Sequence, residues 1–132
     1  MTDASRLPVP RILVVADDEH VRGLLAAVLR ADGHAVDAAT DGVAAVALIG
    51  RHVYTVVLSD LRMPRLDGPE LVRVLEERRP DAMPALIFLA RPAFAPDLAR
   101  FLMDSAAQVL GWPARPADIS RVVARALAPA PA

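Results

Sequence analysis

The sequence contains neither cysteine nor lysine, and each absence removes a class of function. Without cysteine the chain can form no disulfide, no thiolate metal site and no thiol nucleophile. All 15 basic residues are arginine, so functions that need an ammonium group at a fixed place are closed to this chain.

Aromatic residues, net charge and long apolar runs are also scarce. Aromatic residues make up 4% of the 132 residues, so we expect a core of aliphatic side chains and alanines. The net charge of −1 gives no electrostatic case for binding nucleic acid or a membrane surface. No apolar run approaches the ~20 residues of a membrane span, and residues 1–10 do not resemble a signal peptide. We therefore expect one cytoplasmic domain, with neither nucleic acid nor a membrane among its partners.

What the sequence does contain is a regular alternation of aliphatic runs and amphipathic stretches. The aliphatic runs predict strands at residues 11–16, 35–39, 54–59, 85–89 and 108–110. The other stretches predict helices over residues 21–33, 41–50, 67–79, 98–102 and 116–127. Near-continuous aliphatic strands indicate a parallel sheet that helices cover on both faces. The expected fold class is therefore α/β, a doubly wound (βα)5 domain at residues 11–127, with a flexible arm at residues 1–10 and a disordered Ala-Pro tail at residues 128–132.

Residues 56–68 are the stretch around which this prediction is organised. Three aliphatic residues and a serine end at Asp60, and a proline, an aspartate and a glycine follow within eight residues. This order predicts a buried strand, a loop and the start of a helix. Asp67 is a suitable N-cap, and Glu70 three positions later completes a capping-box pattern. Asp60 is therefore expected at the carboxyl end of a strand, where open α/β sheets place their functional groups.

From Asp60 to Gly68 the chain has Asp-Leu-Arg-Met-Pro-Arg-Leu-Asp-Gly, which resembles the motif of the receiver domain of two-component response regulators. The resemblance implies that Asp60 accepts a phosphoryl group from a phosphohistidine. It extends from Arg11 to Leu127 and implies a flavodoxin-like sheet with strand order 2-1-3-4-5. It further implies a sensor histidine kinase or phosphotransfer protein as donor and a downstream protein target, and it leaves a homodimer open.

The resemblance also implies a magnesium site beside the phosphoacceptor. Its ligands would be Asp60, the backbone carbonyl of Arg62 and an acidic pair after the first strand. An ungapped alignment, which the following helix favours, places that pair at Ala16 and Asp17, whereas the local Asp-Asp-Glu string favours Asp17 and Asp18. Asp17 belongs to the site in both registers, although Asp17 and Asp18 could instead only cap the first helix. We expect Mg²⁺ to bind more weakly than in typical receivers.

At the positions that complete the family's switch, the chain departs from the family pattern. The hydroxyl that ends the fourth strand falls on Leu89 if the prolines are aligned, and on Ala90 if the distance from the phosphoacceptor is kept. Neither side chain can donate a hydrogen bond. The family's Lys-Pro pair aligns best with Trp112 and Pro113, a reasonable place for a cis peptide bond, or with Arg115 and Pro116 after a three-residue insertion. Val109 replaces the aromatic residue that often reports the switch.

Two functions remain open. In the first, the chain is a receiver without an output domain of its own, phosphorylated on Asp60 and switching weakly. In the second, it is a pseudo-receiver that binds proteins without an obligatory phosphorylation cycle. The intact Asp17 and Asp60 favour the first, and the missing hydroxyl and ammonium favour the second. An enzyme is not expected, because aspartate-nucleophile phosphatases need a second acid where the chain has Arg62, and no glycine-rich phosphate loop follows a strand.

Overall fold

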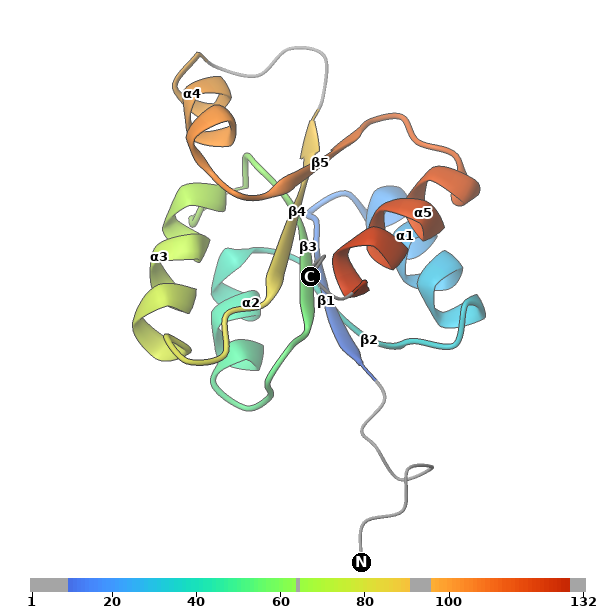
Figure 1. Cartoon of the computed structure of the whole chain (residues 1–132), viewed down its shortest axis with the longest axis horizontal. Helices are drawn as coiled ribbons and strands as arrows, with labels where there is room; N and C mark the ends of the chain where they lie inside the picture. Colours follow the sequence, from blue (N-terminus) through green and yellow to red (C-terminus); the bar gives the residue numbers. More distant parts are fainter. Residues whose placement is uncertain (1–9, 64, 91–95, 129–132) are drawn as a thin grey trace, which may run out of the picture.

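Five parallel strands form a single sheet at the centre of the fold (Figure 1). A computed structural model describes residues 10–63, 65–90 and 96–128, with the backbone alone for residues 96–98. The strands are β1 (Arg11–Val15), β2 (Ala35–Ala39), β3 (Val56–Asp60), β4 (Ala85–Ala90) and β5 (Gln108–Gly111). Their order across the sheet is β2-β1-β3-β4-β5, and every pairing is parallel. The α/β class and the strand order predicted from the sequence are confirmed.

The helices that connect the strands cover both faces of the sheet. They are α1 (Glu19–Ala31), α2 (Gly42–Ile49), α3 (Gly68–Arg78), α4 (Pro96–Asp104) and α5 (Pro116–Leu127). Figure 1 shows α1 and α5 together on one face and α2 and α3 on the other. The predicted capping box at the start of α3 is present, because Asp67 Oδ1 accepts the Glu70 N–H and the Glu70 carboxylate accepts the Asp67 N–H. None of the helices in the described part of the chain has the length and apolar character that crossing a bilayer requires.

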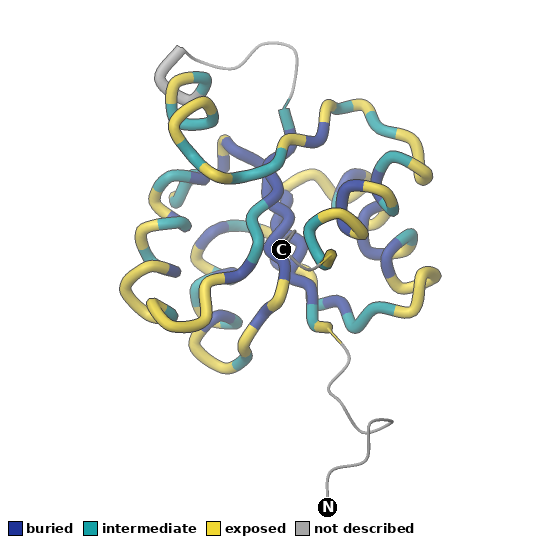
Figure 2. The backbone as a smooth tube through the Cα atoms, viewed as in Figure 1, coloured by how far each residue is buried: buried dark blue, intermediate teal, exposed yellow. Residues whose placement is uncertain are grey.

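Each face of the sheet has its own apolar core. Val56 and Leu58 of β3 pack in the cluster beneath α1 and α5, whereas Val57 packs in the cluster beneath α2 and α3. Successive side chains of a strand point to opposite faces, so a strand covered on both sides needs an unbroken aliphatic run. Figure 2 shows the result, with buried residues along the sheet and exposed residues on the outer sides of the helices.

The element boundaries differ from the sequence prediction by one or two residues. The first strand ends at Val15 rather than residue 16, and the third begins at Val56 rather than residue 54. The fourth and fifth strands each continue one residue further, because Ala90 pairs with Gly111. Apart from Pro10 and Ala128, the predicted arm at residues 1–10 and the predicted tail at residues 128–132 lie outside the described residues.

Two hydrogen bonds converge on the Asp37 carboxylate, in the edge strand β2. Arg11 Nη1 donates to Asp37 Oδ2 at 2.9 Å, and the Tyr54 hydroxyl donates to the same oxygen at 2.7 Å. Burial raises the pKa of Asp37, but the hydrogen bonds from Tyr54 and Arg11 outweigh burial and hold that pKa below its usual value. Burial and the hydrogen bond to Asp37 raise the pKa of Tyr54. These contacts connect β1, β2 and the segment before β3.

Asp37→Asn should lower the free energy of unfolding at neutral pH by about 1.5 kcal/mol, the lower end for hydrogen bonds to a charged group. A carboxyl group whose pKa is lower in the folded than in the unfolded chain stabilises the fold above its unfolded-state pKa, and this contribution is lost as the pH falls through the folded-state value. The difference between wild type and Asp37→Asn should therefore shrink as the pH is lowered from about 7 to about 3, measured by urea unfolding. Glu77→Gln, an exposed position on α3, is the control. An Asp37→Asn effect of the same size at both pH values would contradict the assignment.

Candidate functional site

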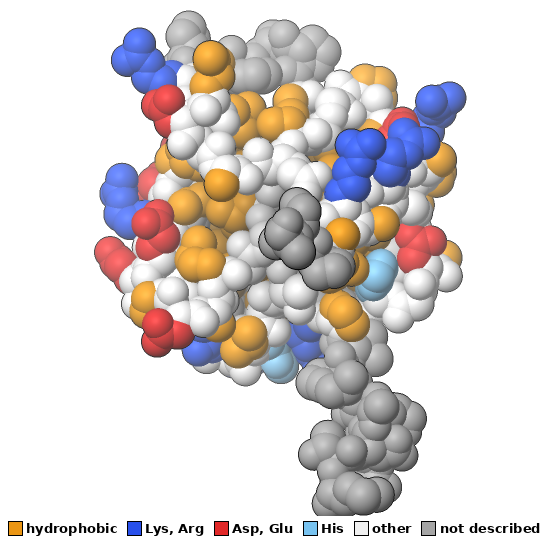
Figure 3. All heavy atoms as spheres, viewed as in Figure 1, with side chains coloured by type: hydrophobic (Ala, Val, Ile, Leu, Met, Phe, Trp, Pro, Cys, Tyr) orange, Lys and Arg blue, Asp and Glu red, His pale blue; other side chains and the backbone are white. Residues whose placement is uncertain are grey.

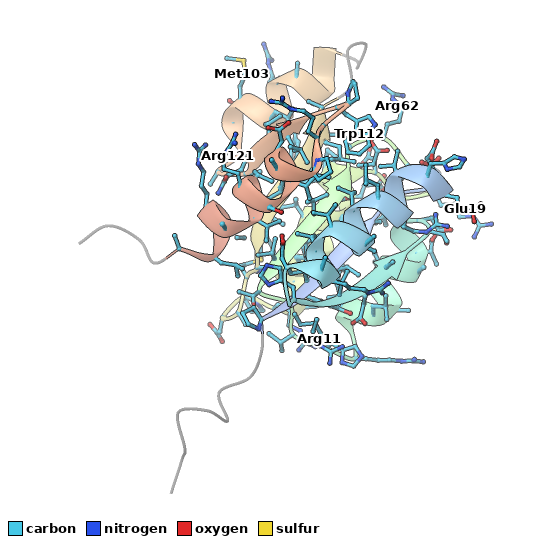
Figure 4. All side chains as sticks on the ribbon, turned by 90° about the vertical axis from the view of Figure 1, so that its right-hand side faces the viewer. Arg11, Glu19, Arg62, Met103, Trp112 and Arg121 are labelled. Carbon is cyan, nitrogen blue, oxygen red and sulfur yellow. The ribbon has the colours of Figure 1, made fainter. Side chains whose placement is uncertain are left out.

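The strand register brings the ends of four strands together at the carboxyl edge of the sheet. Residues at these ends pair across the sheet as Val15 with Ser59, Asp60 with Leu89, and Ala90 with Gly111. The loops that follow β1, β3, β4 and β5 therefore leave the sheet along one edge. Figure 4 shows Arg62 and Trp112, from two of these loops, near that edge and Arg11 at the other end of the sheet. Parallel sheets place their functional groups at this edge.

Asp60 is the last residue of β3, and β3 has a strand on each side. The residue is only 4% exposed, and Asp60 Oδ1 accepts a hydrogen bond from the Leu61 backbone N–H at 3.1 Å. All five residues of β3 are buried, so the carboxylate is carried by one of the most enclosed elements of the fold. The predicted place of Asp60, at the carboxyl end of a strand, is confirmed. Aspartate is rarely buried to this degree, which marks Asp60 as a functional candidate.

The loop after Asp60 rests on the amino end of α2. Arg65 in this loop has a left-handed backbone, with φ of 73°, and its Nη1 lies 3.9 Å from Asp41 Oδ2. A Cβ atom on Gly42, the first residue of α2, would lie 2.5 Å from Leu66 Cβ and 2.7 Å from the Leu66 carbonyl oxygen. Only glycine fits that contact, so the β3–α3 loop and the start of α2 hold each other in place.

The candidate metal ligands after β1 have different surroundings. Asp18 is the N-cap of α1, and its Oδ1 accepts the backbone N–H groups of His20 at 2.8 Å and Val21 at 3.1 Å. Asp17 is exposed, whereas Ala16 is fully buried in the cluster beneath α1 and α5. The capping role that the sequence left open is confirmed for Asp18, and Asp17 is the exposed acid beside the edge.

The structure does not bring Asp17, Asp18 and Asp60 together as one metal site. Among the residues that the structure describes, no three side chains of histidine, cysteine, aspartate or glutamate are grouped so that they could hold a metal ion. The physical reason is that Asp18 turns toward the first turn of α1, and Ala16 has no side-chain oxygen. Asp17 and Asp60 remain as two carboxylates that follow or end the neighbouring strands β1 and β3.

The two candidates for the hydroxyl position on β4 have different environments. Leu89 is 1% exposed and packs in the core beneath α1 and α5. Ala90 is the half-buried last residue of β4, and its carbonyl oxygen accepts the Trp112 backbone N–H at 2.9 Å. Ala90 is therefore the candidate that lies at the strand end, next to Leu89, which pairs with Asp60. The side chain at that end is a methyl group, which donates no hydrogen bond.

Trp112 directly follows β5 and is half-buried against the core cluster that contains Ala16. The Trp112–Pro113 peptide bond is cis, at the place that the sequence suggested. Arg115 precedes α5 with its side chain 85% exposed, and its Nε lies 3.5 Å from Asp118 Oδ2. The hydrogen bond that the Arg115 backbone N–H donates lowers the pKa of Asp118. Arg115 therefore interacts with the first turn of α5, whereas Trp112 directly follows β5.

The family model for the response regulator receiver domain matches residues 12–124. The chain belongs to this family. It is a receiver domain of the two-component response regulators, as the motif at residues 60–68 predicted. Receivers of this family are signal-transduction modules, and they interact with histidine kinases or phosphotransfer proteins.

The relatives that match part of this receiver include two mycobacterial response regulators. Response regulator MprA of Mycobacterium sp. (strain KMS) is 44% identical over 81 residues, which cover 61% of this chain and 35% of that protein. Response regulator MprA of Mycobacterium leprae (strain TN) is 41% identical over 81 residues, with the same coverage of 61% and 35%. The chain spans about a third of the length of the curated relatives it matches.

Solved structures that share the fold of this receiver include two response-regulator or receiver-domain structures. The chemotaxis response regulator CheY4 of Vibrio cholerae has a TM-score of 0.78 and 23% identity, covering 91% of this chain and 100% of that one. At that identity the likeness supports the fold alone. The receiver domain of sensor histidine kinase PA1611 from Pseudomonas aeruginosa PAO1, solved with a magnesium ion coordinated in its active site cleft, has a TM-score of 0.78 and 28% identity. That match covers 89% of this chain and 97% of the other.

Sequence reasoning missed the role of Arg22 in this receiver. Arg22 Nη1 donates to the carbonyl oxygens of Ala16 at 2.9 Å and Asp17 at 3.3 Å, so Arg22 holds the loop that carries the Asp17 carboxylate. An arginine in the first turns of a helix is common, and nothing in the pattern shows that its side chain turns back to the preceding loop.

Val109, at the family's aromatic position, is 47% exposed on β5.

Proposed function

We propose that this receiver accepts a phosphoryl group on Asp60. The observation that supports the proposal is the buried Asp60 carboxylate at the carboxyl end of a central strand. In the transfer, an Asp60 carboxylate oxygen attacks the phosphorus of a phosphohistidine on a sensor histidine kinase or phosphotransfer protein. A P–O bond forms, the P–N bond breaks, and the imidazole that leaves takes up a proton. Such a step depends chiefly on positioning and charge neutralisation.

We also propose that Asp60, Asp17 and the backbone carbonyl of Arg62 hold a divalent cation. Mg²⁺ commonly binds proteins through one or two carboxylates and completes its coordination with waters and phosphate oxygens, so a two-carboxylate set fits this ion. When bound, the ion offsets the negative charge that gathers on the phosphoryl group. Ala16 offers no side-chain ligand and Asp18 caps α1, so the proposed site binds Mg²⁺ more weakly than that of a typical receiver.

The proposed switch is weak because the residues at the carboxyl ends of β4 and β5 are apolar. Ala90 and Trp112 supply neither the hydroxyl nor the ammonium with which the family grips the phosphoryl oxygens. Phosphorylation would then change the surface that a downstream protein target binds less than it does in a typical receiver. The proposed role is that of a cytoplasmic signalling module, not an enzyme, with proteins rather than nucleic acid or membranes as partners.

A different observation supports a second candidate, the pseudo-receiver. Trp112 and Ala16 belong to one apolar cluster, where a working receiver carries an ammonium and a carboxylate. A receiver that had lost the phosphorylation cycle would keep its fold and its protein-binding surfaces. Its Asp60 would then be a structural residue.

Phosphorylation of the purified chain by acetyl phosphate and Mg²⁺ distinguishes the two candidates. Intact-mass measurement should show slow, substoichiometric addition of one phosphoryl group to wild type and none to Asp60→Asn. Asp32→Asn, at an exposed position beyond α1, should behave as wild type. An unmodified mass for wild type after prolonged exposure would support the pseudo-receiver instead.

A further inference from the structure

Helix α2 is apolar on every side, although only one side faces the core. Residues 42–50 carry no polar side chain at all. Ala45 and Ile49 are buried in the cluster beneath α2 and α3, whereas Val43 is 50% exposed and Ala47 is exposed. A helix without a polar face is normally enclosed by protein on all sides. The outer side of α2 therefore has the composition of an interface.

The exposed apolar residues of α2 lie on one face. Val43, Ala47 and Gly50 follow the spacing i, i+4, i+7, so they form one stripe along the helix, which we call the α2 stripe. Ala47 and Gly50 have little or no side chain, so another helix can approach the α2 backbone closely there. The stripe belongs to the face of the sheet covered by α2 and α3, away from α5 (Figure 1).

Arginines border the α2 stripe at both ends. At the amino end, Arg65 is 71% exposed and lies 3.9 Å from the cap residue Asp41. At the carboxyl end, Arg51 follows the stripe and is exposed, and Arg78 Nη1 lies 3.6 Å from where a Cβ on Gly50 would be. Arg79 Nη2 also donates to the Ile49 carbonyl oxygen at 2.8 Å.

The carboxylate of Asp41 lies at the amino end of this helix, and its Oδ1 accepts the Ala44 N–H at 2.8 Å. Of the described charged residues placed here against the stripe, four are arginines and one is Asp41, so positive charge predominates at its rim.

The positive charge around the α2 stripe indicates which kind of partner can bind there. A second copy of the chain, packed by a two-fold axis, would bring the rim arginines of one copy toward those of the other, which like charges oppose. An eight-residue helix is also only about 12 Å long, too short to bury by itself the roughly 800 Å² per partner of a standard interface. A partner helix with acidic flanks gains from the rim instead.

We propose that the α2 stripe is a docking site for an amphipathic helix of another protein, with apolar residues facing Val43 and Ala47 and with acidic residues facing Arg51, Arg65 and Arg78. Helices dock in this way through anchors at i, i+3, i+4 and i+7. The site is separate from the carboxyl edge of the sheet and does not depend on phosphorylation of Asp60.

Two labelled synthetic peptides of about 15 residues, long enough to form a helix, test the proposal. Both carry leucine and alanine at i, i+3, i+4 and i+7, and their flanking positions are glutamate in one and lysine in the other. Fluorescence anisotropy with the full chain should show binding of the glutamate peptide at least about tenfold tighter than that of the lysine peptide. Val43→Glu should weaken the binding of the glutamate peptide by about tenfold, the size of effect expected for an interface anchor.

Two further variants make the outcome decisive. Val109→Glu is the matched control, because Val109 is 47% exposed against 50% for Val43 but lies on β5, and it should leave binding unchanged. Arg51→Glu combined with Arg78→Glu touches no core residue and should reverse the preference toward the lysine peptide. Equal binding of both peptides, or equal loss in Val43→Glu and Val109→Glu, overturns the proposal. A dimer seen by sedimentation that Val43→Glu dissociates overturns it in favour of a second copy.

Discussion

Replacing Trp112 with lysine and Ala90 with threonine together should raise the initial rate of Asp60 phosphorylation by about a hundredfold, the size of effect that one preorganised donor commonly has on a transition state. Lysine at the end of β5 would bring an ammonium to the carboxyl edge, and threonine at the end of β4 would bring a hydroxyl. Both groups would stabilise the negative charge on the transferring phosphoryl oxygens. The measurement is the rate of mass increase with acetyl phosphate and Mg²⁺.

Loss of the indole must be separated from gain of the ammonium. Trp112→Met combined with Ala90→Val is the matched control, because it changes the same positions while adding neither charge nor hydroxyl. Trp112 packs against the core beneath α1 and α5, so both double variants should lose some stability, and circular dichroism should confirm that they remain folded. If the lysine and methionine variants react equally fast, Trp112 is not at the lysine position, and the Arg115 register is the better alignment.

Magnesium should raise the melting temperature of wild type, and Asp17→Ala should remove the increase. At about 10 mM Mg²⁺ and a dissociation constant about tenfold lower, binding to the folded state alone contributes about 1.4 kcal/mol. For a domain of this size that corresponds to a shift of about 5 °C. Because the proposed site has only Asp17 and Asp60 as carboxylates, either alanine or asparagine at Asp17 should abolish the shift. The measurement is differential scanning calorimetry with and without the metal.

Asp18→Asn is the control that tests the competing register. Asparagine is as good an N-cap as aspartate, so the variant keeps the bonds to the His20 and Val21 N–H groups and removes only the charge. The metal-dependent shift should survive in Asp18→Asn. If the shift is lost there and kept in Asp17→Ala, Asp18 rather than Asp17 is the ligand. Trp112 is the only tryptophan, so its emission gives a second signal from the same edge.

The fold could be predicted because its determinants are local and repeated. The aliphatic run that ends at Asp60 and the capping box of Asp67 and Glu70 are short patterns with one physical meaning each. They place Asp60 at the carboxyl end of a strand, as the structure has it, without any knowledge of the tertiary contacts. Strand ends were less certain because pairing with a neighbour, such as Ala90 with Gly111, extends a strand beyond its own aliphatic residues.

The site was only partly predictable, because its remaining features depend on where side chains turn. Asp17 and Asp18 are adjacent and chemically identical, yet only Asp18 turns into the first turn of α1. The sequence therefore leaves both alignments of the acidic pair open, Ala16 with Asp17 and Asp17 with Asp18, until the start of α1 is known from the structure. Arg22 is similar, since its contact with the Ala16 and Asp17 carbonyls follows from the path of the loop. The apolar composition of α2 can be read from the sequence. The sequence does not show which face of α2 is exposed to solvent.

The close fit of Gly42 against Leu66 limits how this domain can vary and how it can open. A side chain at residue 42 would collide with the Leu66 backbone as well as its side chain, so a smaller residue at position 66 would not make room for it. A substitution at residue 42 is therefore tolerated only if the backbone of the β3–α3 loop moves as well. This loop and the first turn of α2 must also separate as a pair, so a fluctuation that frees the β3–α3 loop exposes the amino end of α2 in the same event, as one cooperative unit of local unfolding.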